Sequence, residues 1–127
     1  MPQLFDLHST PFNPENPTLD FGSTTQVLVA ATTVVPTGGF HKISTTGVVV
    51  LTATPTIDME NAVAGQIVTF FNASAAGANT LSFARGVATK LKLGAANRVL
   101  SPDGSITLMY DGEYWIEQSF TLAPATA

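Results

Sequence analysis

The residues that could carry out chemistry are few, and their spacing does not bring them together. The chain has two histidines, His8 and His41, and neither has an acidic residue or a second histidine at metal-ligand spacing. Glu113 and Glu117 are expected to share one face of a strand, where four residues at ~3.4 Å each separate them by about 14 Å. The two carboxylates of glycosidases lie closer together. The sequence therefore predicts no general acid and base pair.

Two acidic pairs could hold a calcium ion if loops brought their members together. Asp58 lies close to Glu60 in the sequence, and Asp103 and Asp111 each precede a glycine. Asp-Gly is a common turn sequence, so turn formation is the preferred interpretation. The chain has no cysteine, and it has no nucleophile elbow, phosphate-binding glycine loop or zinc motif. We therefore expect no catalytic residue, no metal, no cofactor and no enzymatic activity.

The composition predicts a protein that is covered by other protein. Charged residues make up 11% of the 127 residues, against roughly a quarter in ordinary soluble domains, and 45% of the residues are hydrophobic. Too few charges remain to cover the surface of a monomer, so we expect a homo-oligomer. The net charge is −4 and the basic residues form no run, which argues against direct binding of nucleic acid. No signal peptide or membrane-spanning segment is expected.

The elements that must position these residues are predicted to be strands. From residue 26 onward, segments rich in Val, Ile, Thr and Phe alternate with turns, and no helical period is sustained. The predicted fold is all-β, a jelly-roll-like sandwich or a small barrel. The predicted division is an arm at 1–25, one β domain at 26–122 and a tail at 123–127. The expected strands lie within 26–35, 40–44, 46–54, 65–72, 79–84 and 89–93, and on both sides of Asp111 and Gly112.

The first 25 residues are expected to form an extended arm. Four prolines, at positions 2, 11, 14 and 17, fix φ and favour extended backbone before them. The segment is too apolar for a solvated tail, since disordered segments usually lack aromatic residues. It is therefore expected to lie over an apolar surface of another protein, or to pack along its own domain. The predicted contact residues are Leu4, Phe5, Phe12, Leu19 and Phe21.

The single tryptophan, Trp115, lies in a hairpin with two possible registers. A two-residue loop at Asp111 and Gly112 would pair Leu108 with Trp115. A three-residue loop that begins at Tyr110 would pair Leu108 with Tyr114. We prefer the second register because it collects the apolar residues on one face.

In this preferred register Trp115 lies beside Met109 on the face away from the core. A large aromatic side chain there needs a cover, which could be a second sheet, another subunit or a ligand. Subunit contact is the leading choice because the chain is poor in charge. Met109 and Trp115 are therefore the predicted subunit-interface residues.

The segment from Gly65 to Phe120 resembles virion structural proteins of tailed bacteriophages. The resemblance is carried by the order "GQIVTFFN", "NTLSF", "TKLKLG" and "GSITLMYDGEYWIEQSF", with a terminal hairpin typical of capsid decoration proteins and of head-fibre and tail-fibre modules. The resemblance implies an all-β, trimeric and non-catalytic protein. The positions that match the pattern are Asn72, Gly104, Asp111, Gly112 and Trp115.

Composition and resemblance together predict a capsid decoration protein. As a homotrimer on the capsid exterior, made in the host cytoplasm, it would bind the assembled shell of the major capsid protein and stabilise it by linkage. One alternative is a head-fibre or tail-fibre module for host attachment. The other is a carbohydrate-binding sandwich that uses Trp115 and Tyr114, although neighbouring residues of a strand face opposite sides and cannot form one flat platform.

Overall fold

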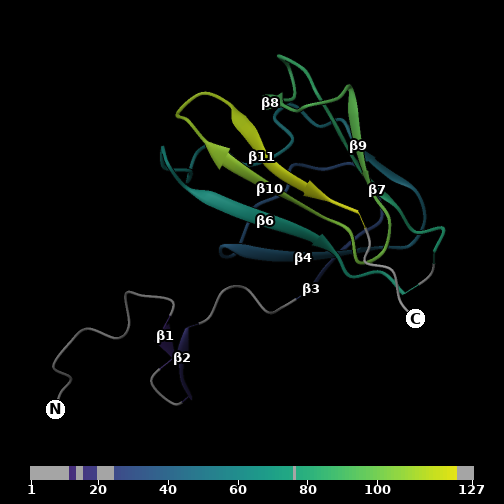
Figure 1. Cartoon of the computed structure of the whole chain (residues 1–127), viewed down its shortest axis with the longest axis horizontal. Coiled ribbons are helices and arrows are strands. Elements are labelled where there is room, and N and C mark those ends of the chain that lie inside the picture. Colours follow the sequence, from purple (N-terminus) through teal and green to yellow (C-terminus); the bar gives the residue numbers. More distant parts are fainter. Residues whose placement is uncertain (1–11, 14–15, 20–24, 76, 123–127) are drawn as a thin grey trace, which may run out of the picture.

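The chain folds into two β-sheets that pack face to face as a sandwich. The computed structural model describes residues 12–13, 16–19, 25–75 and 77–122, and every regular element among them is a strand. Figure 1 shows β4, β6, β10 and β11 side by side in one layer, with β7 and β9 in the other. The predicted all-β sandwich is confirmed.

The larger sheet has six strands and mixed pairing. β3, β4 and β6 run parallel to one another, β10 is antiparallel to both β6 and β11, and β8 is parallel to β11. The strands lie in the spatial order β3 (Thr25–Leu28), β4 (Phe40–Thr45), β6 (Ile67–Asn72), β10 (Ser105–Tyr110), β11 (Trp115–Thr121) and β8 (Leu91–Lys92).

The smaller sheet covers the inner face of the larger one. It consists of β5 (Val49–Leu51), β7 (Leu81–Ala84) and β9 (Asn97–Leu100), with β7 parallel to β5 and antiparallel to β9. A separate two-stranded sheet joins β1 (Phe12–Asn13) to β2 (Asn16–Leu19), and Phe12 lies opposite Leu19 in it.

Alternation of apolar and polar residues forms the core. In β10 the side chains of Ile106, Leu108 and Tyr110 are buried, and the residue after each of the first two faces outward. The largest buried side chains come from both sheets. Phe70 of β6 and Phe83 of β7 pack against each other with ring centroids 5.6 Å apart. Buried contacts of this kind hold the two layers together, because each fully buried apolar side chain contributes about 1.5–3 kcal/mol.

Asn72 ties the ends of the two sheets together. Its buried side chain lies at the end of β6, and Nδ2 donates to the carbonyl oxygens of Leu100 at 2.7 Å and Asn79 at 3.0 Å. Its Oδ1 accepts a hydrogen bond from the N–H of Ser74 at 3.0 Å. Asn72 thus links the larger sheet to β9 and leaves no polar atom of its buried amide unsatisfied.

The β10–β11 hairpin adopts neither of the two predicted registers. Tyr110 lies opposite Trp115 and Met109 opposite Ile116, so the loop between the strands has four residues. Trp115 therefore shares a face with Tyr110, at 5.1 Å between ring centroids, and no part of it is exposed. The predicted position of Trp115 on the outward face is wrong, and the residue belongs to the core of its own domain.

Asp111 sets the length of this loop. Its Oδ1 accepts hydrogen bonds from the N–H groups of Tyr114 at 2.7 Å and Glu113 at 2.8 Å, and these bonds lower the pKa of the Asp111 carboxyl. Gly112 takes a φ of 101°, and the Tyr110 hydroxyl donates to its carbonyl oxygen. These contacts close a four-residue loop, whereas the Asp-Gly dipeptide alone indicated a shorter one.

Two other elements differ from the expectation. The strand predicted at 26–35 ends at Leu28, and Val34 returns to the core through an isolated bridge with Ile57. Val27 and Val29 are exposed, so this apolar run does not mark burial on both faces.

β9 was not predicted. In the segment 89–93 the two leucines are buried as expected.

The predicted arm lies largely outside the described residues. Leu4, Phe5 and Phe21 are not described, while Phe12 and Leu19 belong to β1 and β2. Their roles as contact residues, and the division at residues 25 and 122, stay predictions.

Replacing Trp115 by alanine is expected to destabilise the fold by about 3–5 kcal/mol, because it empties the space beside Tyr110. Chemical unfolding monitored by circular dichroism measures this loss, and Trp115→Phe should lose less. Tyr114→Ala is the matched control, since this neighbouring aromatic residue is only half-buried. A Trp115→Ala variant of unchanged stability would contradict the assignment to the core.

Candidate functional site

The outward side of the six-stranded sheet carries the first candidate site. Five apolar side chains from β4, β6, β10 and β11 lie on it, and we call them the outer face. They are Phe40, Ile67, Phe71, Met109 and Ile116.

A straight row of side chains crosses the outer face at the end of the sheet that carries the β10–β11 loop. Met109 lies opposite Ile67 on one side and opposite Ile116 on the other, so the three side chains are neighbours across three strands. Ile67 is 53% exposed, and the other two are half-buried. Met109, predicted as an interface residue, thus lies on the outer face.

The rest of the outer face is apolar or hydroxylated. Phe40 and Phe71 pack with ring centroids 5.8 Å apart, and the hydroxyls of Thr69 and Thr107 are hydrogen-bonded at 2.9 Å. The charged residues in the six strands are Lys42, Lys92 and Glu117, and the glutamate points between the sheets. A sheet face with apolar side chains and so few charged residues is suited to contact with protein.

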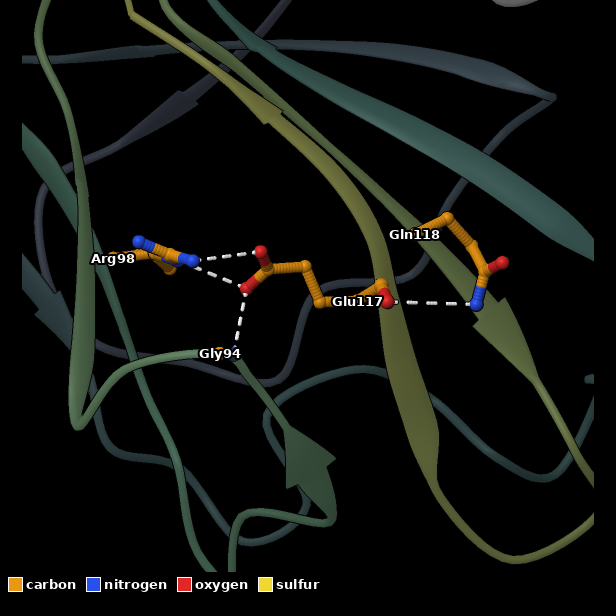
Figure 2. Close-up of polar contacts among 4 residues, drawn as sticks. All are labelled: Gly94, Arg98, Glu117 and Gln118. Atoms are coloured by element: carbon orange, nitrogen blue, oxygen red, sulfur yellow. Dashed lines mark hydrogen bonds and ion pairs between the residues drawn. The ribbon is translucent and has the colours of Figure 1, made fainter.

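An ion pair closes the sandwich where β9 and β11 face each other. Figure 2 shows Arg98 of β9 reaching Glu117 of β11. The guanidinium donates from Nε to Oε1 and from Nη2 to Oε2, both at 2.9 Å, and the N–H of Gly94 donates to Oε1 at 3.0 Å. The Arg98 guanidinium also lies 4.6 Å from the centroid of the Phe120 ring. This bidentate geometry fixes the spacing of the two sheets at this edge.

The contacts of the pair favour its charged forms. Hydrogen bonds from Arg98 lower the pKa of the Glu117 carboxyl, and the same interaction raises the pKa of Arg98. A methyl group on Gly94 would come within 2.7 Å of Nη2 of Arg98, so glycine leaves room for the guanidinium.

A second candidate site surrounds Tyr114 at the end of the sandwich. Lys90 Nζ lies 5.1 Å and Lys92 Nζ lies 4.5 Å from the centroid of the Tyr114 ring. An open pocket of about 450 Å³ adjoins the ring, and Arg85 and Val87 also line it. Trp115, the other proposed stacking residue of the carbohydrate alternative, is buried and takes no part.

His41 has a structural position. It is buried beside Phe70, and its Nε2 lies 2.7 Å from Oε1 of Gln26. Burial lowers the pKa of His41, which favours the neutral ring. Among the described residues, its side-chain partners are Gln26 and Thr37, whose hydroxyl lies 3.4 Å from Nδ1, and neither is acidic.

The acidic residues considered for calcium form turns instead. Asp58 accepts hydrogen bonds from the backbone and side chain of Asn61, and Asp103 has a φ of 73° in the turn before Gly104. Glu113 lies exposed in the loop before β11 rather than on a strand with Glu117. Across residues 12–13, 16–19, 25–75 and 77–122, no three side chains are placed to hold a metal ion. The same ranges contain no helix that is long and apolar enough to cross a bilayer.

The sequence-based interpretation did not identify most residues of the outer face or of the site around Tyr114. Phe40, Ile67 and Phe71 alternate with buried residues in their strands, so alternation within these strands is the signal that could have marked the outer face. The partners Arg98 and Glu117 are far apart in the chain, and no local pattern signals their pairing.

A comparison with protein families identifies the sandwich. The model of the phage depolymerase C-terminal beta sandwich domain matches residues 27–116, which is well over half of the chain. The chain belongs to this family. Comparisons with curated proteins and with solved structures gave no match.

Membership in this family confirms the broader part of the sequence-based interpretation. The chain is a bacteriophage structural protein of the virion, built on a β-sandwich. The family match includes β4, β6, β10 and the start of β11, and therefore all five residues of the outer face. Capsid decoration and a trimeric state stay predictions.

The Arg98–Glu117 pair should give the stability a defined pH dependence. Because the pKa of Glu117 is lowered by folding, the pair stabilises the fold fully above the ordinary carboxyl value of 4.5 and loses this effect as the pH falls through the folded-state pKa. We expect Glu117→Gln to be less stable than wild type at pH 7, and the difference to shrink below pH 4.5. Urea unfolding at pH 3–7 measures it.

The matched control for this measurement is Glu113→Gln, which removes an exposed carboxylate from the adjacent loop. Its stability relative to wild type should change little over the same range. A Glu117→Gln variant with a constant deficit from pH 7 to pH 3 would contradict the role of the ion pair.

Proposed function

We propose that the chain is a non-enzymatic module of a phage tail fibre that forms a homotrimer through its outer face. The family supports a β module associated with the phage tail. The observation that carries the proposal is the row of Ile67, Met109 and Ile116 across three strands. It forms an apolar strip on the outward face of the larger sheet, where Ile67 is 53% exposed.

A second copy of the chain is the occupant that best suits this face. The face combines aromatic and aliphatic side chains with hydroxyls, and its charged residues, Lys42 and Lys92, are both positive and lie on opposite sides of the strip. Uncharged strips can meet between copies without bringing like charges directly together. The chain's low content of charged residues, 11%, favours the same arrangement.

A binding role rather than catalysis is supported by the acidic side chains. Glu117 is committed to Arg98, Asp111 to the hairpin loop, and Asp58 to a turn with Asn61. Carboxylates held in this way stabilise the fold and are poorly placed to transfer protons to a substrate.

Charges placed in the strip should break the trimer. We expect the wild-type chain to sediment as a trimer and the double variant Ile67→Lys/Met109→Lys to sediment as a folded monomer, because lysines there would be buried without partners. The dissociation constant should rise more than tenfold. Analytical ultracentrifugation with circular dichroism measures both assembly and folding.

The control is Val50→Lys/Val99→Lys, which changes two exposed valines on the outward side of the smaller sheet. This variant should remain trimeric. A monomeric wild type, or a trimer that survives lysines at both strip positions, would rule out the outer face as the interface.

Capsid decoration is the second candidate, and one observation favours it. β1 and β2 pair only with each other among the described strands, so this segment does not join either sheet of the sandwich. We propose that the predicted arm residues Leu4, Phe5, Phe12, Leu19 and Phe21 would contact the major capsid protein in that case. Three arms on one trimer would bind more tightly than a single arm.

Deleting residues 1–24 distinguishes the two candidates, because β3 begins at Thr25 and is retained. Under the tail-fibre proposal the truncated chain keeps its trimeric state, and neither form binds purified capsids. Under capsid decoration the full chain occupies capsids and the truncated chain loses most of this occupancy. Cosedimentation with capsids gives the measurement, and equal occupancy by both forms would remove the arm from the account.

A further inference from the structure

We propose that a small cavity beside Trp115 binds an ordered water molecule, which accepts a hydrogen bond from the indole N–H. We call this space the indole cavity. It has a volume of about 30 Å³, and its lining includes Trp115 and, from one loop, Asp58, Asn61, Ala62 and Gln66. The inference does not depend on the proposed function.

The indole N–H of Trp115 is a buried donor. The residue is 0% exposed, and among the side chains that the structure describes its Nε1 is the buried polar atom without a hydrogen-bond partner. Folded proteins leave few buried donors unpaired, because such a group loses its bonds to water without replacement. An acceptor beside Nε1 is therefore expected, and Trp115 lines a cavity that has room for one.

Backbone hydrogen bonds hold the walls of the indole cavity apart. At one end of the loop, the N–H of Asp58 donates to the carbonyl oxygen of Val34 at 2.9 Å. At the other end, the N–H of Gly65 donates to the carbonyl oxygen of Tyr110 at 2.6 Å, and the N–H of Tyr110 donates to that of Gln66 at 2.9 Å. The loop is thus fixed to the sandwich on both sides and cannot collapse onto the indole ring.

The polarity of the lining suits water. Asp58, Asn61 and Gln66 supply a carboxylate and two amides, whereas cavities that stay dry are lined by apolar side chains. Among the described residues Asn61 donates to Oδ2 of Asp58, so Oδ1 can accept a proton of the water. With the indole N–H as donor and side-chain oxygens as acceptors, the water has the two to four polar partners that a buried water needs.

Other occupants fit the indole cavity less well. An anion would accept from the indole N–H, but the carboxylate of Asp58 would repel it. A calcium ion takes six to eight oxygen ligands, and the lining offers one carboxylate beside an N–H donor. Organic ligands occupy pockets of roughly 300–1,000 Å³, whereas about 10–15 Å³ is enough for a water molecule.

The proposed water connects the loop 58–66 to the strand β11. The backbone bonds of Gly65 and Gln66 tie this loop to Tyr110 of β10, and the water adds a link from the same loop to Trp115. The polar end of the tryptophan is then satisfied inside the core. This explains how an indole ring can be completely buried where a phenyl ring would need no partner.

The first experiment is nuclear magnetic resonance of the isotope-labelled full chain, whose single tryptophan gives one indole N–H signal. We expect magnetisation transfer from water to this proton with opposite signs in the laboratory-frame and rotating-frame experiments, which marks a bound water. Exchange of the proton with solvent gives equal signs. The exposed side-chain amide of Gln118 is the internal control and should show no bound-water signal.

The second experiment replaces Trp115 with benzothienylalanine, which keeps the shape of the indole and has sulfur in place of the N–H. If the N–H donates to a bound water, the replacement removes a hydrogen bond and lowers the midpoint of thermal unfolding. If the N–H has no acceptor, the replacement removes an unsatisfied buried donor and raises the midpoint. We expect the midpoint to fall.

A pair of variants on the loop locates the water. Ala62→Val narrows the indole cavity and should abolish the bound-water signal of the indole proton. Ala64→Val is the matched control, because it makes the same change on the same loop at an exposed residue, and it should keep the signal.

Three outcomes would overturn the proposal. They are the absence of a bound-water signal at the indole proton of the wild-type chain, a higher unfolding midpoint with benzothienylalanine, and an unchanged signal in Ala62→Val.

Discussion

The register of the β10–β11 hairpin is the constraint on which the rest of the structure depends. A shift by one residue exchanges the two faces of a strand. The four-residue loop held by Asp111 turns Trp115 inward and Ile116 outward. It also leaves Tyr114 outside the strand, beside the lysines. The positions of Trp115 in the core, of Ile116 on the outer face and of Tyr114 beside the lysines therefore follow from this one loop.

The strand β11 contributes to the core, to the ion pair and to the outer face. Trp115 fills the core, Glu117 binds Arg98 across the opening between the sheets, and Ile116 completes the strip on the outer face. Because the inner face of the larger sheet is satisfied within the chain, the apolar side chains on its outward side are available for contact with another chain. This division explains how a sandwich with its own complete core can still be poor in charge. It supports binding to protein in a phage virion, the setting to which the family belongs.

The sequence was sufficient for the fold class and insufficient for the site. Residues typical of strands in 40–44 and 65–72 and alternation in 89–93 predicted strands, and the structure has β4, β6 and β8 within or overlapping these segments. The hairpin was mispredicted because the side-chain hydrogen bonds of Asp111 lengthen the loop beyond what Asp-Gly alone indicates. The Arg98–Glu117 pair and the convergence of Arg85 with Tyr114 depend on tertiary contacts. No periodicity within a single segment encodes such contacts.

The most direct test of this account is the accessibility of a single thiol on either side of the hairpin. The chain has no cysteine, so a residue replaced by cysteine carries the only thiol. In a folded Ile67→Lys background, which keeps the outer face uncovered, the account predicts rapid reaction of Ile116→Cys with a thiol reagent and protection of Leu108→Cys. A protected thiol at position 116 would place Ile116 in the core and Trp115 outside, and would contradict the register from which the candidate sites follow.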